Sequence, residues 1–181
     1  MRTIGLVRHF KVLQSRPKKK WMTSAEFDAW VEEYDHCDVV RPPVSLDSSE
    51  WDMCMSSDLS RAVVTSKQLY DKEIIFTEHL REIKIKSVFD THLRLHYYIW
   101  LLLGRIIWPL SNKAQPEGKQ EIMKRVRGII DQLEQSENSR LLIISHGALM
   151  LYMRYELRKR RYTGPLFLKP ENGKLYTFHK D

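Results

Sequence analysis

Some polar residues of this sequence have the types that chemistry on a phosphoryl group requires: they are Arg8, His9, Arg61, Glu82 and His146. A neutral imidazole can act as the nucleophile, while guanidinium groups and a second histidine hold the phosphoryl oxygens that gain charge. A carboxylic acid can protonate the leaving oxygen and then activate a water molecule. None of these steps calls for a metal ion.

The two histidines each follow a short apolar segment. Residues 3–7 lead into Arg8 and His9, and residues 141–144 lead through a serine into His146. Short apolar runs that alternate with amphipathic segments are typical of parallel strands joined by crossover helices. Ligands of such α/β sheets bind beyond the carboxyl ends of the strands. If the two strands are neighbours, we expect the two histidines to meet there, beside Arg8.

Further elements are predicted from apolar periodicity and capping signals. Strands are expected at 51–56 and 73–77, so that Glu82 follows a strand end near the same edge of the sheet. A helix is expected over 59–70, with Ser57-Asp58 as its N-cap signal. Arg61 then lies in its first turn, where the helix dipole also favours an anion; the alternative is an ordinary surface arginine. Other predicted elements are a helix after the Thr23–Glu26 capping box, a long helix from Pro116 to about Ser136, a helix over 148–161, and a terminal hairpin of 166–168 and 175–178 around Asn172-Gly173.

Residues 88–115 are the least regular part of the sequence. His92 and His96 are four residues apart and could share a helix face, but no glutamate stands where a zinc-hydrolase helix has one. We therefore predict no metal site. The apolar stretch 97–110 is expected to form a core helix or a cap over the site, with an interfacial membrane contact as the weaker alternative.

Composition limits the class of protein. The chain has 181 residues, of which 43% are hydrophobic and 29% charged, as in an ordinary soluble globular protein with one domain, 1–181. The apolar stretch 97–110, roughly 14 residues long, falls short of the ~20 needed to span a bilayer. Neither cysteine, Cys37 or Cys54, has metal-type spacing, and no signal peptide precedes the first strand, so we expect reduced thiols and a cytoplasmic location.

The formal net charge of +7 favours anionic partners: a small phosphorylated substrate, nucleic acid or an acidic membrane surface. Basic residues cluster at 16–20 and 158–161. The first cluster is either a cationic rim that attracts an anion to the site or a solvated loop. The second cluster follows a predicted helix, where cations suit the dipole, so we interpret it as structural. No recognition motif accompanies these clusters, which disfavours nucleic-acid binding, and the oligomeric state is open.

The chain resembles the histidine phosphatase superfamily, also called the phosphoglycerate mutase-like family. The matching segments occur in the family's order: Leu6-Val7-Arg8-His9, residues 56–65, Leu80-Arg81-Glu82, Arg125-Val126 and Ser145-His146-Gly147. The resemblance implies a three-layer α/β/α sandwich with a mostly parallel central sheet. It implies that His9 becomes a phosphohistidine, that Arg8, Arg61 and His146 complete the phosphate pocket, and that Glu82 is the proton donor. It also implies activity without a metal or an organic cofactor.

One residue departs from the family's pattern. The family usually has Arg-His-Gly, whereas here Phe10 follows His9. Glycine allows a close backbone approach to a ligand, so Phe10 is expected to reshape the pocket, to form an apolar wall of it, or to abolish catalysis.

Three functions are therefore considered. The first is a metal-independent phosphomonoesterase, an acid phosphatase-like hydrolase that acts through His9. The second is a catalytically impaired protein that binds a phosphorylated ligand. The third is a phosphotransferase of the phosphoglycerate mutase type, which the shortness of the chain disfavours.

Overall fold

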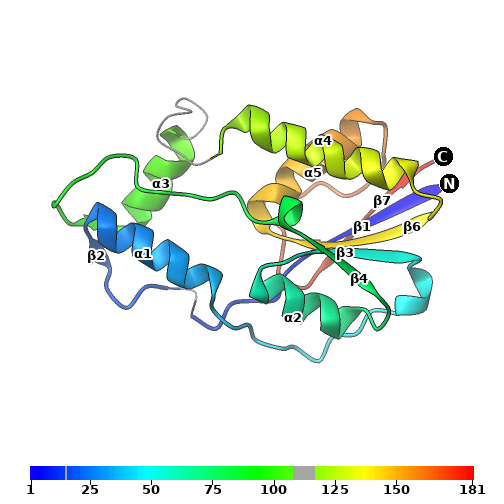
Figure 1. Ribbon diagram of the computed structural model, residues 1–181, viewed down its shortest axis with the longest axis horizontal. Helices are drawn as coiled ribbons and strands as arrows, with labels where there is room; N and C mark the ends of the chain where they lie inside the picture. The colour runs from blue at the N-terminus through cyan, green and yellow to red at the C-terminus, as the bar shows by residue number, and fades with distance from the viewer. Residues whose placement is uncertain (15, 108–116) are drawn as a thin grey trace.

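The computed structural model describes residues 1–14, 16–107 and 117–181, in which a mostly parallel sheet forms the centre of the fold (Figure 1). Within these residues the sheet has five strands in the order β4-β3-β6-β1-β7. In chain order the strands are β1 (Arg2–Arg8), β3 (Met53–Ser57), β4 (Ile74–Thr77), β6 (Arg140–Ser145) and β7 (Leu175–Lys180). Only the pairing of β1 with β7 is antiparallel among the strand pairs of this sheet in the described chain. The expectation that the two histidine-bearing strands are neighbours is confirmed, because β1 pairs with β6 in parallel.

Helices cover both faces of the sheet, which gives the predicted three layers. Helix α2 (Ser60–Leu69) lies on one face, and α4 (Lys119–Gln135) and α5 (Gly147–Lys159) lie together on the other (Figure 1). The central strands β1 and β6 have nearly continuous apolar sequences because both of their faces are buried. Leu141 and Ile143 of β6 join the cluster beneath α4 and α5, whereas Leu142 and Ile144 join the cluster beneath α2. The three-layer α/β/α fold is thereby confirmed.

The start of α2 differs from the prediction. Its N-cap is Leu59, which makes no side-chain capping hydrogen bond, so the predicted Ser57-Asp58 cap is wrong. Ser57 is still the last residue of β3, and its hydroxyl faces the histidine site described below. Asp58 pairs instead with Arg81, whose Nη2 lies 2.5 Å from the carboxylate. Asp58 therefore has a tertiary partner in place of a helix end, while the Ser57 hydroxyl accepts from the backbone N–H of Leu59 at 3.3 Å.

Helix α1 (Ser24–Asp35) and helix α3 (Tyr97–Ile107) form a smaller lobe beyond the carboxyl ends of the parallel strands (Figure 1). Thr23 and Glu26 form the predicted capping box at the start of α1. Phe27 of α1 stacks on Trp100 of α3 at 5.8 Å, inside a buried cluster separate from those of the main sheet. Residues 97–107 of the apolar stretch therefore form a helix that is buried on one side. Residues 108–110 of that stretch, including Trp108, lie outside the described residues, as does Pro116 at the predicted start of α4.

The predicted pairing of His92 and His96 on one helix is wrong. His92 lies in a bend, and His96 belongs to β5 (Leu95–His96), which pairs with β2 (Trp21–Met22). No group of three or more His, Cys, Asp or Glu side chains in the described part of the chain is placed to hold a metal ion. None of the helices within residues 1–14, 16–107 and 117–181 is long and apolar enough to cross a membrane.

The predicted terminal hairpin is also wrong. Residues 166–168 form no strand, and β7 pairs with β1 instead. The Asn172-Gly173 turn is present, and Gly173 has the left-handed φ of +73° that suits glycine. Pairing with the long apolar edge of β1 is more favourable for β7 than pairing with residues 166–168 in a local hairpin.

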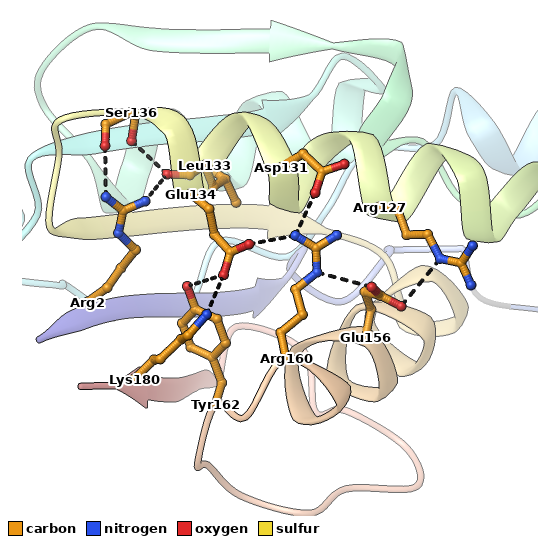
Figure 2. Close-up of polar contacts among 10 residues, drawn as sticks. All are labelled: Arg2, Arg127, Asp131, Leu133, Glu134, Ser136, Glu156, Arg160, Tyr162 and Lys180. Atoms are coloured by element: carbon orange, nitrogen blue, oxygen red, sulfur yellow. Dashed lines mark hydrogen bonds and ion pairs between the residues drawn. The ribbon is translucent and has the colours of Figure 1, made fainter.

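An ion-pair network locks α4, α5 and β7 together away from the histidines (Figure 2). Arg160, at the C-cap of α5, contacts Asp131 and Glu134 of α4, each at 2.6 Å, and Glu156 of its own helix at 3.0 Å. Lys180 of β7 pairs with Glu134 at 2.9 Å. The structural interpretation of the basic residues at 158–161 is correct for Arg160.

Candidate active site

His9 and His146 meet at the carboxyl ends of β1 and β6. The strand register pairs Arg8 with Ser145, and the backbone N–H of His9 donates to the Ser145 carbonyl at 2.9 Å. The two imidazole centroids lie 5.0 Å apart, and the rings are tilted by 53°. Both side chains are almost completely buried. Neighbouring parallel strands thus bring together two residues that are 137 positions apart, from 9 to 146, in the sequence.

The hydrogen bonding of His9 leaves one ring nitrogen free. Its Nδ1 lies 2.6 Å from the carbonyl oxygen of Phe10. A carbonyl only accepts, so Nδ1 carries the hydrogen and Nε2 of the neutral ring keeps its lone pair. Burial, and then the positive charges of Arg61 and Arg8, lower the pKa of His9 to about 3, against the opposing effect of the Phe10 hydrogen bond. His9 is therefore a neutral imidazole with an available Nε2 at physiological pH.

His146 is held from two sides. Arg61 donates from Nε to Nδ1 of His146 at 3.2 Å, and the Ser57 hydroxyl lies 2.9 Å from Nε2. Because a guanidinium only donates, the neutral ring carries its hydrogen on Nε2 and donates it to Ser57. Burial, together with the charges of Arg61 and other nearby groups, holds the pKa of His146 well below its usual value. The site thus combines two uncharged imidazoles with fixed positive charges.

Arg61 is buried, so the alternative of a surface arginine is wrong. Its side chain is 1% exposed, and its Nη1 lies 2.9 Å from Asp35 Oδ1 at the end of α1. Its guanidinium also lies over the ring of Tyr34, 5.4 Å from the centroid. The aromatic ring and the carboxylate fix the plane of the guanidinium beside the two histidines.

One N–H donor of the Arg8 guanidinium, that of Nε, is available to a ligand. Its Nη1 donates to the Pro170 carbonyl at 3.0 Å, whereas its buried Nε has no hydrogen-bond partner among the described residues. A Cβ atom at Gly147 would lie 3.2 Å from this Nε, so glycine there leaves room for the guanidinium. Buried donors are nearly always paired, and an unpaired guanidinium N–H beside the histidines is suited to an anion.

Glu82 lies against the N-terminus of α5. Its carboxylate accepts from the backbone N–H groups of Leu149 at 3.2 Å and Ala148 at 3.3 Å, and from that of Ile83 at 3.1 Å. Free N–H groups and the helix dipole both favour a carboxylate at this position. Arg125 of α4 holds the chain just before Glu82 by donating to the Arg81 carbonyl at 2.8 Å. The matching Arg125-Val126 segment thus contributes a positioning contact.

A cavity of about 230 Å³ opens beside these groups. Its lining residues come from the sheet edge, α1, α2, the segment after β4 and α3: Arg8, His9, Trp30, Val31, Tyr34, Asp35, Arg61, Glu82, Ile83, Lys84, Ile85, Leu101 and Arg105. The cavity therefore brings together Arg8, His9, Arg61 and Glu82, with His146 behind them in contact with His9 and Arg61. A second cavity of about 520 Å³ shares Arg8 and Glu82 with the first, and Lys169 adds a cation to it.

Phe10 does not form a wall of either cavity, contrary to the expectation from the sequence. Its side chain is 1% exposed and packs in the apolar cluster beneath α2, against Gly173. Its φ is not in the left-handed region that would favour glycine. The backbone N–H of Phe10 donates to Thr65 Oγ1 at 2.8 Å. Phenylalanine therefore fits this position without narrowing the site.

Several site residues were missed from the sequence. Asp35 and Ser57 contact Arg61 and His146, respectively, and Arg105 lines both cavities. Asn172 donates from its amide to the His9 carbonyl at 2.7 Å. The Asn-Gly turn signal did mark position 172, but a turn signal does not reveal which strand the turn contacts.

The comparisons with known proteins agree with this geometry. Residues 43–179 match the family model of the histidine phosphatase superfamily (branch 1). No curated protein matches the sequence. Among solved structures, a mycobacterial glucosyl-3-phosphoglycerate phosphatase is 17% identical with a TM-score of 0.58, and the match covers 98% of this chain and 89% of that chain.

Other similar structures carry related descriptions. An Entamoeba histolytica phosphoserine phosphatase in complex with 3-phosphoglyceric acid is 16% identical with a TM-score of 0.55, covering 98% of this chain and 90% of that one. A protein of Escherichia coli described as a putative α-ribazole-5′-phosphate phosphatase is 15% identical with a TM-score of 0.57, with the same coverage of 98% and 90%. At these identities the likeness shows the fold.

Proposed function

The chain belongs to the histidine phosphatase superfamily (branch 1), and from this premise we propose that it is a phosphomonoesterase that acts through a phosphohistidine on His9. The activity is carried by residues 1–181 as a single domain, in the cytoplasm, where free thiols such as Cys37 and Cys54 persist. The substrate is a small phosphorylated molecule.

One observation carries the proposal: the neutral, buried His9 keeps an unprotonated Nε2 at a cavity lined by two guanidinium groups. A protonated imidazole is no nucleophile, so a pKa of about 3 keeps His9 in the reactive form. Arg8 and Arg61 attract the phosphoryl oxygens and stabilise the charge that they carry in the transition state.

In the first step Nε2 of His9 attacks phosphorus in line with the ester oxygen. The N–P bond forms, the P–O ester bond breaks, and Glu82 passes to the leaving oxygen the proton that the monoanionic substrate brings. The positive charge that forms on the imidazole is offset by the phosphoryl group and by the carbonyl of Phe10, which accepts from Nδ1.

In the second step Glu82, now a carboxylate, takes a proton from water while the water oxygen attacks phosphorus. The N–P bond breaks, and inorganic phosphate and neutral His9 result. The N–H groups at the start of α5 hold Glu82 beside the cavity throughout. Arginines supply the positive charge that a metal ion supplies in other phosphatases, so we propose that the activity is metal-independent.

The placement of Phe10 favours an active enzyme over an impaired binding protein. A phenylalanine that filled the cavity would block substrate, but Phe10 lies in the core beneath α2. At the end of β1 the backbone N–H of His9 still donates to the Ser145 carbonyl, and that of Phe10 donates to the Thr65 hydroxyl.

The experiment that tests the function is phosphate release from a panel of phosphomonoesters in EDTA, with wild type and His9→Ala side by side. We expect His9→Ala to lower kcat/KM at least about a thousandfold. His92→Ala, an exposed histidine away from the cavity, is the matched control and should retain activity. Quenching of wild type and labelled substrate in alkaline detergent should trap base-stable, acid-labile phosphate on His9.

Different results identify the other functions. Phosphate binding that depends on Arg8 and Arg61, without release or labelling, would identify a binding protein. Transfer of the label to an acceptor alcohol in preference to water would identify a phosphotransferase. Release that survives His9→Ala but not chelation would reject the proposal.

A further inference from the structure

Helix α3 exposes an apolar stripe next to the side that lines the cavity. Tyr98, Leu102 and Ile106 follow at intervals of four residues and are 57%, 57% and 52% exposed. The other side of the helix is buried, with Trp100 fully enclosed. Residues at this spacing lie one above another on a helix, so the exposed side chains form one continuous apolar strip, which we call the α3 stripe.

Aromatic contacts extend the α3 stripe onto the small β2–β5 sheet. Tyr98 stacks on His96 with centroids 5.5 Å apart and planes 25° from parallel. His96 in turn meets Trp21 edge to face at 5.5 Å, and Trp21 is 58% exposed. The apolar surface therefore runs from Trp21 along α3 to Ile106, at the end of the molecule opposite the chain termini (Figure 1).

A cationic cluster adjoins this surface at its Trp21 end. The exposed residues of the cluster are Arg16, Lys18, Lys19, Lys20 and Arg94. The Lys20 carbonyl accepts from the backbone N–H of Tyr97 at 2.8 Å, which fixes the cluster beside the first turn of α3. Lys19 and Arg94 both lower the pKa of Glu26, so both cations lie within electrostatic reach of this carboxylate. Glu26 neutralises one charge, by pairing with Lys19 at 3.1 Å.

We propose that the α3 stripe and the adjoining cationic cluster bind the surface of an anionic lipid bilayer. Apolar side chains on one side of a helix, an interfacial tryptophan and neighbouring basic residues are the combination that places a helix in the headgroup region. A nucleic acid would bind the basic residues but would offer no apolar surface to Leu102 and Ile106. A second copy of this chain would bring its own cationic cluster to the same surface, where like charges repel.

The proposal is independent of the phosphatase activity, but it concerns a helix that the cavity also uses. Leu101 and Arg105 of α3 line the cavity, whereas Leu102 and Ile106 are exposed and do not line it. Binding to a bilayer through the α3 stripe thus uses side chains other than those that line the cavity.

Co-sedimentation of the full chain with vesicles tests the proposal. We expect binding to vesicles of phosphatidylcholine mixed with phosphatidylserine, weaker binding to phosphatidylcholine alone, and weakening with added salt. The emission of Trp21 should shift to the blue, and this part of the shift should disappear in Trp21→Phe. Leu102→Ser/Ile106→Ser and Lys18→Glu/Lys20→Glu should each weaken binding to the mixed vesicles at least about tenfold.

The matched controls are substitutions on α5, whose C-terminal end is also basic. Arg158→Glu/Lys159→Glu makes the same change of charge at exposed positions, and Tyr155→Ser removes an aromatic ring that is 61% exposed on α5. Both should bind the mixed vesicles as wild type does. Phosphate release from a soluble ester, or the thermal midpoint if no ester is cleaved, verifies that each variant is folded.

Other outcomes would overturn the proposal. These are equal binding to neutral and anionic vesicles, equal losses in the control variants, or no binding by wild type. A wild-type dimer that Leu102→Ser/Ile106→Ser dissociates would show that a second copy covers the α3 stripe. RNA binding that depends on Lys18 and Lys20 but not on Leu102 would assign the cluster to nucleic acid.

Discussion

At the scale of single residues, the site is built on uncharged histidines among permanent positive charges. Burial disfavours a proton on His9 and His146, and the charges of Arg61 and Arg8 disfavour it further. A phosphoryl group carries the negative charge that balances these guanidinium groups. The same groups therefore select the ligand and keep the nucleophile deprotonated.

Glu82→Gln should separate phosphate binding from catalysis. Glutamine keeps an oxygen acceptor for the N–H groups of Ala148 and Leu149 but cannot give up a proton. We expect kcat for alkyl phosphates to fall about 10²–10⁴-fold, with a much smaller loss for 4-nitrophenyl phosphate, whose leaving group needs no proton. Inhibition by inorganic phosphate should persist.

The matched control is Glu78→Gln, an exposed carboxylate that pairs with Arg81 before the same segment. Glu78→Gln should leave kcat and KM near the wild-type values for both kinds of substrate. Equal losses for good and poor leaving groups in Glu82→Gln would exclude the role of proton donor.

The lowered pKa values of His9 and His146 also predict how stability depends on pH. Below pH ~6.5 the unfolded chain protonates these histidines while the folded chain keeps them neutral. The unfolded state then binds more protons, so the free energy of unfolding falls as pH falls. Between pH 7 and 5.5 the expected loss is roughly 1 kcal/mol for each histidine.

Urea denaturation in phosphate-free buffer measures this dependence. His9→Gln/His146→Gln should flatten the curve between pH 7 and 5.5 relative to wild type. An unchanged slope in the double variant would mean that the two rings are protonated in the folded protein.

At the scale of elements, the end of β1 is held on several sides. Beyond its pairing with β6, the Phe10 N–H donates to Thr65 of α2. The Arg8 carbonyl accepts from the Gly173 N–H at 2.8 Å, and the His9 carbonyl accepts from Asn172. A strand, a helix and a turn thus converge on residues 8–10, which is how the fold fixes the proposed nucleophile.

Gly173→Ala should destabilise the protein, and Gly128→Ala should stabilise it. At Gly173 φ is +73°, and an added Cβ would lie 3.0 Å from the Phe10 ring, so we expect a loss of about 1 kcal/mol or more. At Gly128, in the exposed interior of α4, an added Cβ meets nothing within 4 Å, so helix propensity should give a gain of about 0.5–1 kcal/mol.

Thermal or urea unfolding of the two variants measures these opposite shifts. Gly173→Ala should also lower kcat because it disturbs the turn that holds Arg8 and His9, whereas Gly128→Ala should leave kcat unchanged. A Gly173→Ala variant as stable and as active as wild type would show that the turn adapts without cost.

At the scale of the whole molecule, the cavity lies between a rigid sheet edge and a smaller lobe. The sheet has extensive apolar clusters on both faces, whereas α1 and α3 share a small aromatic cluster around Phe27 and Trp100. Regions with few buried contacts open with less free energy than the core. The lobe carries cavity residues such as Tyr34 and Leu101, so a ligand should couple to its opening.

Hydrogen exchange should reveal this division. We expect amides of α1 and α3 to exchange faster than those of β1 and β6, and inorganic phosphate to slow exchange at the end of α1, where Asp35 contacts Arg61. The C-terminal end of α4, where Asp131 and Glu134 pair with Arg160, is the internal control, since it lies away from the cavity and should be unaffected. Equal exchange in lobe and sheet, with or without phosphate, would contradict this division.

Much of the fold and the family was predictable from local signals. Apolar runs of strand length gave β1 and β6, the Thr23–Glu26 capping box gave the start of α1, and a three- and four-residue period gave the buried face of α4. These local signals predict the structure correctly because each depends only on residues that are close in the sequence. The catalytic candidates directly follow the predicted strands, so their positions could be predicted as well.

The tertiary structure decided the contacts that span long distances in the sequence. Asp58 pairs with Arg81 rather than capping a helix, Phe10 packs in the core, and Asn172-Gly173 supports β1 rather than a local hairpin. In each case a local preference of about 1 kcal/mol competes with the burial or pairing of polar groups, which is worth as much or more. The sequence by itself therefore determined the strands, the family and the residue types of the site, whereas only the packed chain determined which partner each side chain found, because that choice depends on residues far away in the sequence.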